Sequence, residues 1–104
     1  ATSIIVATTT AWADGVSPMQ AWKRSEVLPA RTSGDFARLT ALMKALEGSV
    51  PDKAVFPRWA EWSRTAAEAA ARKDLSAMNQ ACTDCHSAYR KTYQASFRNL
   101  PAPR

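Results

Sequence analysis

Hydrophobic residues recur at helical spacing along most of the chain from Ser17 onward. Ser17 can cap a helix, Pro18 suits the first helical position, and Gln20 can complete a capping box. Together these three signals predict that a helix starts here. We expect this helix to run toward Pro29, which should end or kink it because proline disturbs the turn that precedes it.

Two further helices follow in the pattern. Ser33-Gly34-Asp35 should open the second helix and Gly48 should close it. Its apolar residues, three or four apart, are Phe36, Leu39, Leu42, Met43 and Leu46. Residues 49–56 contain a proline and are predicted to form a loop. Pro57 can then start a third helix, which carries along one side Trp59, Trp62, Ala66, Ala69 and Ala70.

A fourth helix is predicted after Asp74, which can serve as its cap. Its apolar positions alternate by three and four, as in the seam of a bundle, and are Leu75, Met78, Cys82, Cys85, Tyr89 and Thr92. Residues 98–104 hold two prolines and should be irregular. The pattern shows no alternation of strands and helices, so we predict an all-α fold, a bundle of four short helices.

Residues 1–14 differ from the rest of the chain. They carry no charge before Asp14 and are rich in Thr, Ile and Val, which favour extended structure. Ala11-Trp12-Ala13 also resembles the cleavage end of a secretory signal peptide. Two interpretations stay open, a signal-peptide remnant and an extended arm. The predicted organisation is therefore residues 1–14 as arm or remnant and residues 15–104 as the helical domain with a short irregular tail.

The composition fits one small globular domain. The chain has 104 residues, of which 46% are hydrophobic and 22% charged, unlike a disordered protein. The hydrophobic core of a chain this short is thin unless a cofactor adds apolar surface. No stretch approaches the roughly 20 apolar residues of a membrane helix. We therefore expect no membrane span.

The net charge of +5 is concentrated toward the end of the chain. No acidic residue follows Asp84, and the basic residues beyond it are Arg90, Lys91, Arg98 and Arg104. Such a patch could face nucleic acid, anionic lipid or an acidic protein. Nucleic acid is the weaker alternative, because the sequence contains no recognition motif. An acidic protein partner fits better.

The sequence Cys82-Thr83-Asp84-Cys85-His86 is a C-x-x-C-H motif, the attachment signal for haem c. On a helix, residues three and four apart share a face, so both thiols and the imidazole point the same way. The thiols can add to the two vinyl groups of one porphyrin, and His86 can ligate its iron. A structural zinc site needs four ligands, whereas the chain has two cysteines and one histidine. We predict one covalent haem c.

The second axial ligand of the iron must come from earlier in the chain, because no Met or His follows His86. Met78 lies on the same helix and cannot reach around the ring. Met43 stands among core leucines, where methionine usually fills space. Met19 is the favoured candidate. Ligation by Lys23 and an open sixth site remain as alternatives.

The motif and the residues after it, Ser87-Ala88-Tyr89-Arg90, resemble the C-terminal signature of the class II c-type cytochromes. The resemblance implies an antiparallel four-helix bundle with haem near one end and Arg90 beside a propionate. In low-spin, methionine-ligated members the ligand comes from the first helix, about fifteen positions before a Gly–acidic turn. Met19 precedes Gly34-Asp35 by that interval. The arm at residues 1–14 has no counterpart in the family.

Motif and resemblance together predict a monohaem cytochrome that carries single electrons between redox proteins and is not itself an enzyme. Two alternatives remain: an NO- or CO-binding protein with an open sixth haem site, and a fixed haem subunit of a larger redox complex. The resemblance implies a periplasmic or otherwise exported location. The expected partners are acidic redox proteins, with a homodimer or larger complex possible through residues 1–14.

Overall fold

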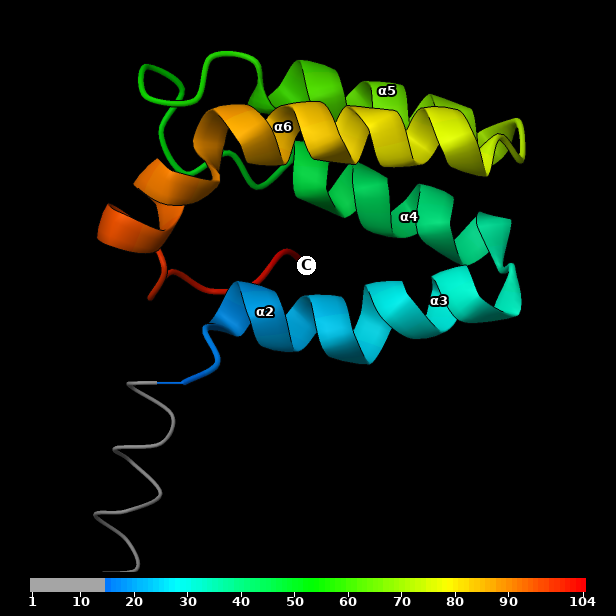
Figure 1. The fold of residues 1–104 in the computed structure, drawn as a ribbon, viewed down its shortest axis with the longest axis horizontal. Coiled ribbons are helices and arrows are strands. Elements are labelled where there is room, and N and C mark those ends of the chain that lie inside the picture. Colours follow the sequence, from blue (N-terminus) through cyan, green and yellow to red (C-terminus); the bar gives the residue numbers. More distant parts are fainter. Residues whose placement is uncertain (1–14) are drawn as a thin grey trace, which may run out of the picture.

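The computed structural model describes residues 15–104, and every regular element in that range is helical (Figure 1). The described part of the chain therefore has the predicted all-α, four-helix arrangement. The predictions for residues 1–14, an arm or a signal remnant, lie outside the described residues. Within this range no helix has both the length and the apolar character needed to cross a membrane.

The chain begins with a continuous helical run of three segments, α2 (Pro18–Trp22), η1 (Lys23–Val27) and α3 (Leu28–Ser33), called here the N-terminal rod. Its start is the predicted capping box. The Gln20 backbone N–H donates to Ser17 Oγ at 3.2 Å, and the Ser17 N–H donates to Gln20 Oε1 at 2.9 Å. These two bonds satisfy backbone donors that the first turn leaves without helical partners.

Of the two outcomes predicted for Pro29, an end or a kink, the helix does not end there; it is locally distorted instead. The proline has no N–H, and its ring crowds the carbonyl one turn earlier. The preceding turn widens into the π-helix η1, in which the Leu28 N–H bonds to the Lys23 carbonyl. A π-turn is a known way for a helix to absorb such a local conflict. The distortion thus replaces a break, and the rod continues to Ser33.

Gly34 joins the rod to α4 (Phe36–Glu47), and it has the left-handed backbone conformation, with φ +69°. Asp35 then caps α4, its carboxylate accepting from the Arg38 N–H at 3.0 Å. Gly48 ends α4 as predicted, with an ordinary negative φ of −78°. The two glycines therefore end their helices in different ways.

This contrast gives a prediction for stability. Gly34→Ala should lower the free energy of unfolding by about 1–2 kcal/mol, because the left-handed region is unfavourable for residues with a Cβ. A Cβ at Gly34 meets nothing within 4 Å, so the loss is purely conformational. Gly48→Ala is the matched control: its Cβ would have only ordinary contacts, 3.7 Å or longer. Urea denaturation measures both, and equal losses would contradict the prediction.

Helix α5 (Trp59–Ala71) lies between α4 and α6 (Leu75–Ser96) and packs against both. Its buried face consists largely of small residues, which let the neighbouring helices approach closely: Ala66, Ala67, Ala69 and Ala70. The helix begins two residues after Pro57, the predicted start. Asp74 caps α6 as predicted and accepts from the Ala77 N–H at 3.0 Å.

The predicted seam of α6 is correct in its middle and wrong at its ends. Met78 is buried, and Cys82, Cys85 and Tyr89 are half-buried, but Leu75 and Thr92 are exposed. At the C-terminal end the buried residue is Tyr93. A strict alternation of three and four residues assumes a repeat of 3.5, whereas a straight helix turns every 3.6 residues. Over several turns the buried face therefore moves from position 92 to position 93.

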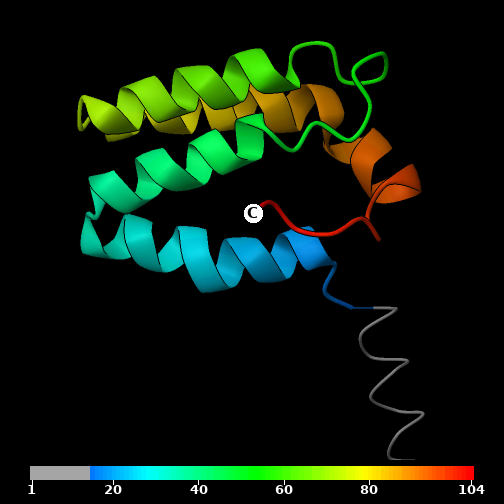
Figure 2. The ribbon, with the colours of Figure 1, turned by 180° about the vertical axis from the view of Figure 1, so that it is seen from behind.

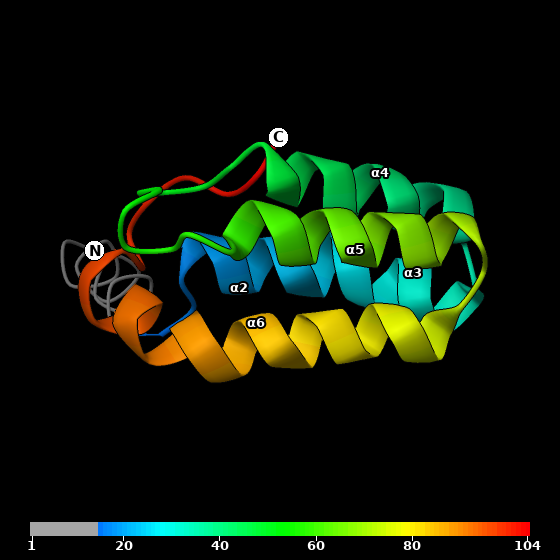
Figure 3. The same ribbon diagram turned by 90° about the horizontal axis from the view of Figure 1, so that it is seen from above.

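The bundle is open along one side. In the rod, α3 and η1 contact α4, whereas α2 makes no close backbone approach to α5 or α6 within the described range (Figures 1 and 3). After α6 the irregular tail turns back toward the C-terminal end of α4 (Figures 2 and 3). Arg98 Nη2 donates to the Gly15 carbonyl at 2.8 Å, which ties the tail to the start of the rod. The open side lies between the rod and α6.

Candidate functional site

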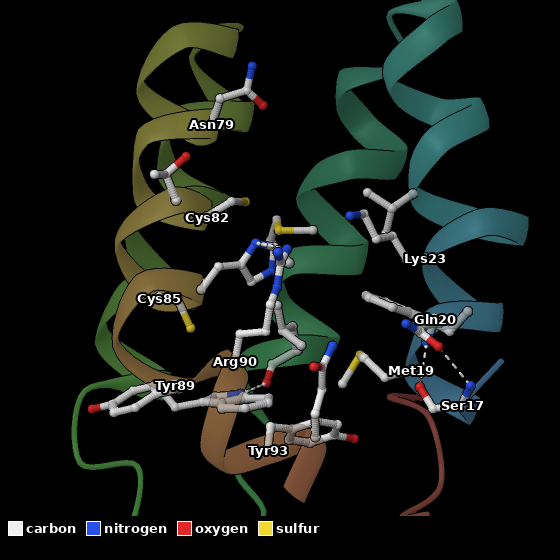
Figure 4. Close-up of a pocket in the computed structure, with 18 of the residues that line it drawn as sticks. Ser17, Met19, Gln20, Lys23, Asn79, Cys82, Cys85, Tyr89, Arg90 and Tyr93 are labelled. Atoms are coloured by element: carbon white, nitrogen blue, oxygen red, sulfur yellow. Dashed lines mark hydrogen bonds between the residues drawn. The ribbon is translucent and has the colours of Figure 1, made fainter. Parts of the chain in front are cut away.

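A cavity of about 630 Å³ lies between the N-terminal rod and α6 (Figure 4). This volume falls within the roughly 300–1,000 Å³ of pockets that hold small molecules and cofactors. Much of its wall is apolar or aromatic, formed by Trp22, Val27, Met43, Leu46, Trp59, Met78 and Tyr93. The pocket can therefore cover a large apolar ligand.

The C-x-x-C-H motif lies in the middle of α6 and faces this cavity. Cys82, Cys85 and His86 all line it (Figure 4 draws the two cysteines). Both cysteines are half-buried and form no disulfide with each other, while His86 remains accessible through the cavity. The helical spacing thus presents both sulfur atoms and the imidazole on one wall, as the sequence predicted.

The surroundings shift the pKa of all three groups in the direction that favours their uncharged forms. Burial raises the pKa of the Cys85 thiol to about 11, and the neighbouring Cys82 adds to this effect. Burial also raises the pKa of Cys82, although the charges of Arg31 and Lys23 act in the opposite direction. Partial burial of the ring lowers the pKa of His86, and the positive charges of Arg90 and Lys23 lower it further. A neutral imidazole is the form that ligates metals.

The wall opposite α6 contains both predicted candidates for a sixth ligand. Met19 on α2 and Lys23 on η1 line the cavity and are half-buried (Figure 4). Met43 and Met78 also border it, but they are only 2% and 1% exposed and belong to the core. The structure thus brings Met19 and Lys23 to the same pocket as His86.

The basic residues after Asp84 occupy different environments. Arg90 lines the cavity, and its Nη2 lies 3.2 Å from His86 Nδ1. Lys91 is exposed on α6. Arg98 is half-buried and is engaged by the Gly15 carbonyl, so its contribution is structural. Arg104 borders a second, shallower hollow beside the end of α4. Lys91 is therefore the member of the group most available to a partner.

An aromatic cluster closes one end of the cavity. Phe56, Trp59 and Tyr93 are its buried members, and Met19 and Tyr89 pack against it. Trp59 is fixed by its indole N–H, which donates to the Leu46 carbonyl at 2.9 Å. The hydroxyl of Tyr89 accepts from the Arg58 N–H at 2.8 Å. Met19 is therefore packed against residues of the loop before α5, of α5 and of α6.

Sequence reasoning missed Arg31, Trp59 and Tyr93 as pocket residues. For Arg31 a signal existed, because it lies eight positions after Lys23 and two helical turns bring both to one face of a rod. That inference required the helix to continue through Pro29. Trp59 and Tyr93 reach the pocket through tertiary packing, which has no local signal.

Within residues 15–104 no group of three His, Cys, Asp or Glu side chains is arranged to hold a metal ion by itself. No family model matches the sequence, and the searches of curated proteins and of solved structures return no match. The chemistry of the cavity therefore carries the functional assignment.

Proposed function

We propose that this protein is a monohaem c-type cytochrome that carries single electrons between redox proteins outside the cytoplasm. One observation carries the proposal: two thiols and an imidazole stand side by side on one wall of an apolar cavity of cofactor size. The spacing is that of haem c attachment, and both cysteines and the one histidine of the chain take part. The residues around the cavity therefore fit the group that the motif implies.

The two cysteines and the histidine of the motif have different roles in this proposal. Cys82 and Cys85 would hold the haem covalently through thioether bonds to its vinyl groups, and His86 would ligate the iron through an imidazole nitrogen. Bound haem provides a one-electron couple whose potential depends on its axial ligands and its burial. The chain contributes an apolar wall that keeps water away, and Arg90 places a positive charge beside the proximal histidine.

Met19 is proposed as the second axial ligand. It lies across the cavity from α6 and is held by the aromatic cluster at the pocket's end. A His–Met pair keeps iron six-coordinate and raises the reduction potential. This arrangement suits an electron carrier, whereas an open site would favour binding of NO or CO.

An optical spectrum of the oxidised and reduced protein tests this. The wild-type ferric protein should be low-spin with a weak sulfur-to-iron band in the far red, and Met19→Ala should abolish that band because the sulfur is removed. Met43→Leu is the matched control, since Met43 borders the same cavity from the core. A high-spin wild type that binds CO without competition would establish the gas-binding alternative instead. A spin change in Lys23→Ala alone would assign the ligand to Lys23.

Membership of the class II c-type cytochromes is part of this proposal, supported by Cys82–His86 and by the following Tyr89 and Arg90. The four-helix arrangement is consistent with it. An exported location is proposed because haem c is attached outside the cytoplasm. The proposed partners are acidic redox proteins, with exposed Lys91 on the haem-bearing helix as a steering charge.

A further inference from the structure

The cavity is lined by three basic side chains, Lys23, Arg31 and Arg90. Among the described residues that line it, none is acidic. A largely apolar pocket with several cations and no counter-charge favours a ligand that is apolar in its body and negatively charged at its edge. This pattern is independent of the cysteine motif.

The three cations come from opposite walls. Lys23 and Arg31 belong to the N-terminal rod, and Arg90 belongs to α6. The ion pairs formed within residues 15–104 join Glu26 to Arg38, Arg58 to Glu61 and Glu47 to Arg64, and so leave the three pocket cations out. Their charges therefore face the cavity without an anionic partner from the described chain.

The backbone of the rod stays apart from the wall that the rod faces, although the Met19 side chain packs against the aromatic cluster. The backbone of α2 makes no close approach to α5 or α6 within the described range, and it is η1 and α3 that approach α4. A ligand that reaches both walls would complete the fourth side of the bundle.

We propose that Lys23 and Arg31 bind the carboxylates of the porphyrin, so that a porphyrin with free carboxylates links the N-terminal rod to α6. The inference rests on the proposed function and extends it, because it names the residues that select a dicarboxylate ligand. A Lys or Arg side chain forms a charge-assisted hydrogen bond with a carboxylate. Such a bond is stronger than one between neutral groups when water is partly excluded. Arg31 is exposed at the rim and Lys23 is half-buried, so Lys23 should contribute more.

The test uses the full chain produced without attached haem and two probes, iron-free mesoporphyrin IX and its dimethyl ester. Neither probe has vinyl groups, so neither can react with the cysteines. Binding is followed by quenching of the tryptophan fluorescence, since Trp22 and Trp59 line the cavity. The free acid should bind roughly tenfold more tightly than the ester, the ratio expected for one or more charge-assisted hydrogen bonds.

The double variant Lys23→Gln/Arg31→Gln should lose most of this preference, because Arg90 is then the one basic side chain left among the described residues that line the cavity. Arg24→Gln/Arg72→Gln is the matched control, because it removes the same charge from exposed positions that do not line the cavity. Equal binding of acid and ester by wild type would overturn the inference while leaving the pocket a porphyrin site. Failure of a helical wild-type chain to bind either probe would overturn the proposed function, and the inference with it.

A second measurement covers the case in which the haem-free chain is not helical by circular dichroism. In the protein with attached haem, resonance Raman bands of propionate bending report hydrogen bonds to the carboxylates. Lys23→Gln and Arg31→Gln should shift these bands, and Arg24→Gln should not. Bands unchanged in both pocket variants would overturn the inference.

Discussion

Replacing both Cys82 and Cys85 by alanine is expected to abolish all pigment that survives acid–organic extraction. These are the two cysteines of the chain, so no other thiol can form a thioether. Each single variant should retain one thioether and leave one vinyl group intact. Because an intact vinyl extends the conjugation of the ring, the absorption of the single variants should move to longer wavelength. Extraction followed by a reduced pyridine spectrum measures both effects.

Thr83→Ala is the control for this experiment. Thr83 stands between the cysteines and is exposed, so its loss should leave attachment intact. His86→Ala should retain covalent pigment but change its spin state, because the thioethers remain while the axial nitrogen is lost. Wild-type protein that releases its pigment on extraction, or never acquires any, would refute the proposed function.

Phe56→Ala is expected to lower the free energy of unfolding by about 3–5 kcal/mol, the usual range for removing a buried phenylalanine. Phe56 is only 1% exposed, although it lies in the loop between α4 and α5. Its ring is surrounded by four others, with centroid distances of 5.0–6.4 Å, namely Trp59, Tyr89, Tyr93 and Phe97. Truncation would leave a void at the centre of this cluster.

Val55→Ala is the matched control. The side chain of Val55, which precedes Phe56, is 39% exposed, so its truncation should change the free energy of unfolding by no more than about 0.5 kcal/mol. Small domains are stable by roughly 5–15 kcal/mol, so the loss at Phe56 would remove a large share of the total. Urea denaturation followed by circular dichroism distinguishes the two variants. A loss below about 1 kcal/mol at Phe56 would show that the surrounding rings close the void.

Local signals in the sequence predict the helix boundaries well. Ser17, Asp35 and Asp74 each cap a helix with their own side chains, and such bonds involve residues three apart. The C-x-x-C-H motif is local in the same sense, since a single helix is enough to bring its three side chains to one face. The sequence alone is therefore sufficient to locate this part of the candidate site.

Features that depend on tertiary packing cannot be predicted in this way. The sequence pattern puts Phe56 in a loop and gives it no role, yet it is the centre of an aromatic cluster built by residues from three segments. The pattern predicts an end or a kink at Pro29 and does not decide between them, because the compensating π-turn requires no distinctive sequence. Arg31 is missed for the same reason. Where the outcome depends on how distant segments meet, periodicity gives no information.

The position of the motif on α6, after the other helices of the cavity, also has a consequence for biosynthesis. Synthesis proceeds from the N-terminus, and domains generally fold in that order. The N-terminal rod, α4 and α5 all precede α6 in the chain, so every other helix of the cavity has left the ribosome before Cys82 does. Under the proposed function, attachment of the cofactor is thus a late event in maturation. A chain interrupted before α6 would expose an apolar wall without any means of covering it covalently.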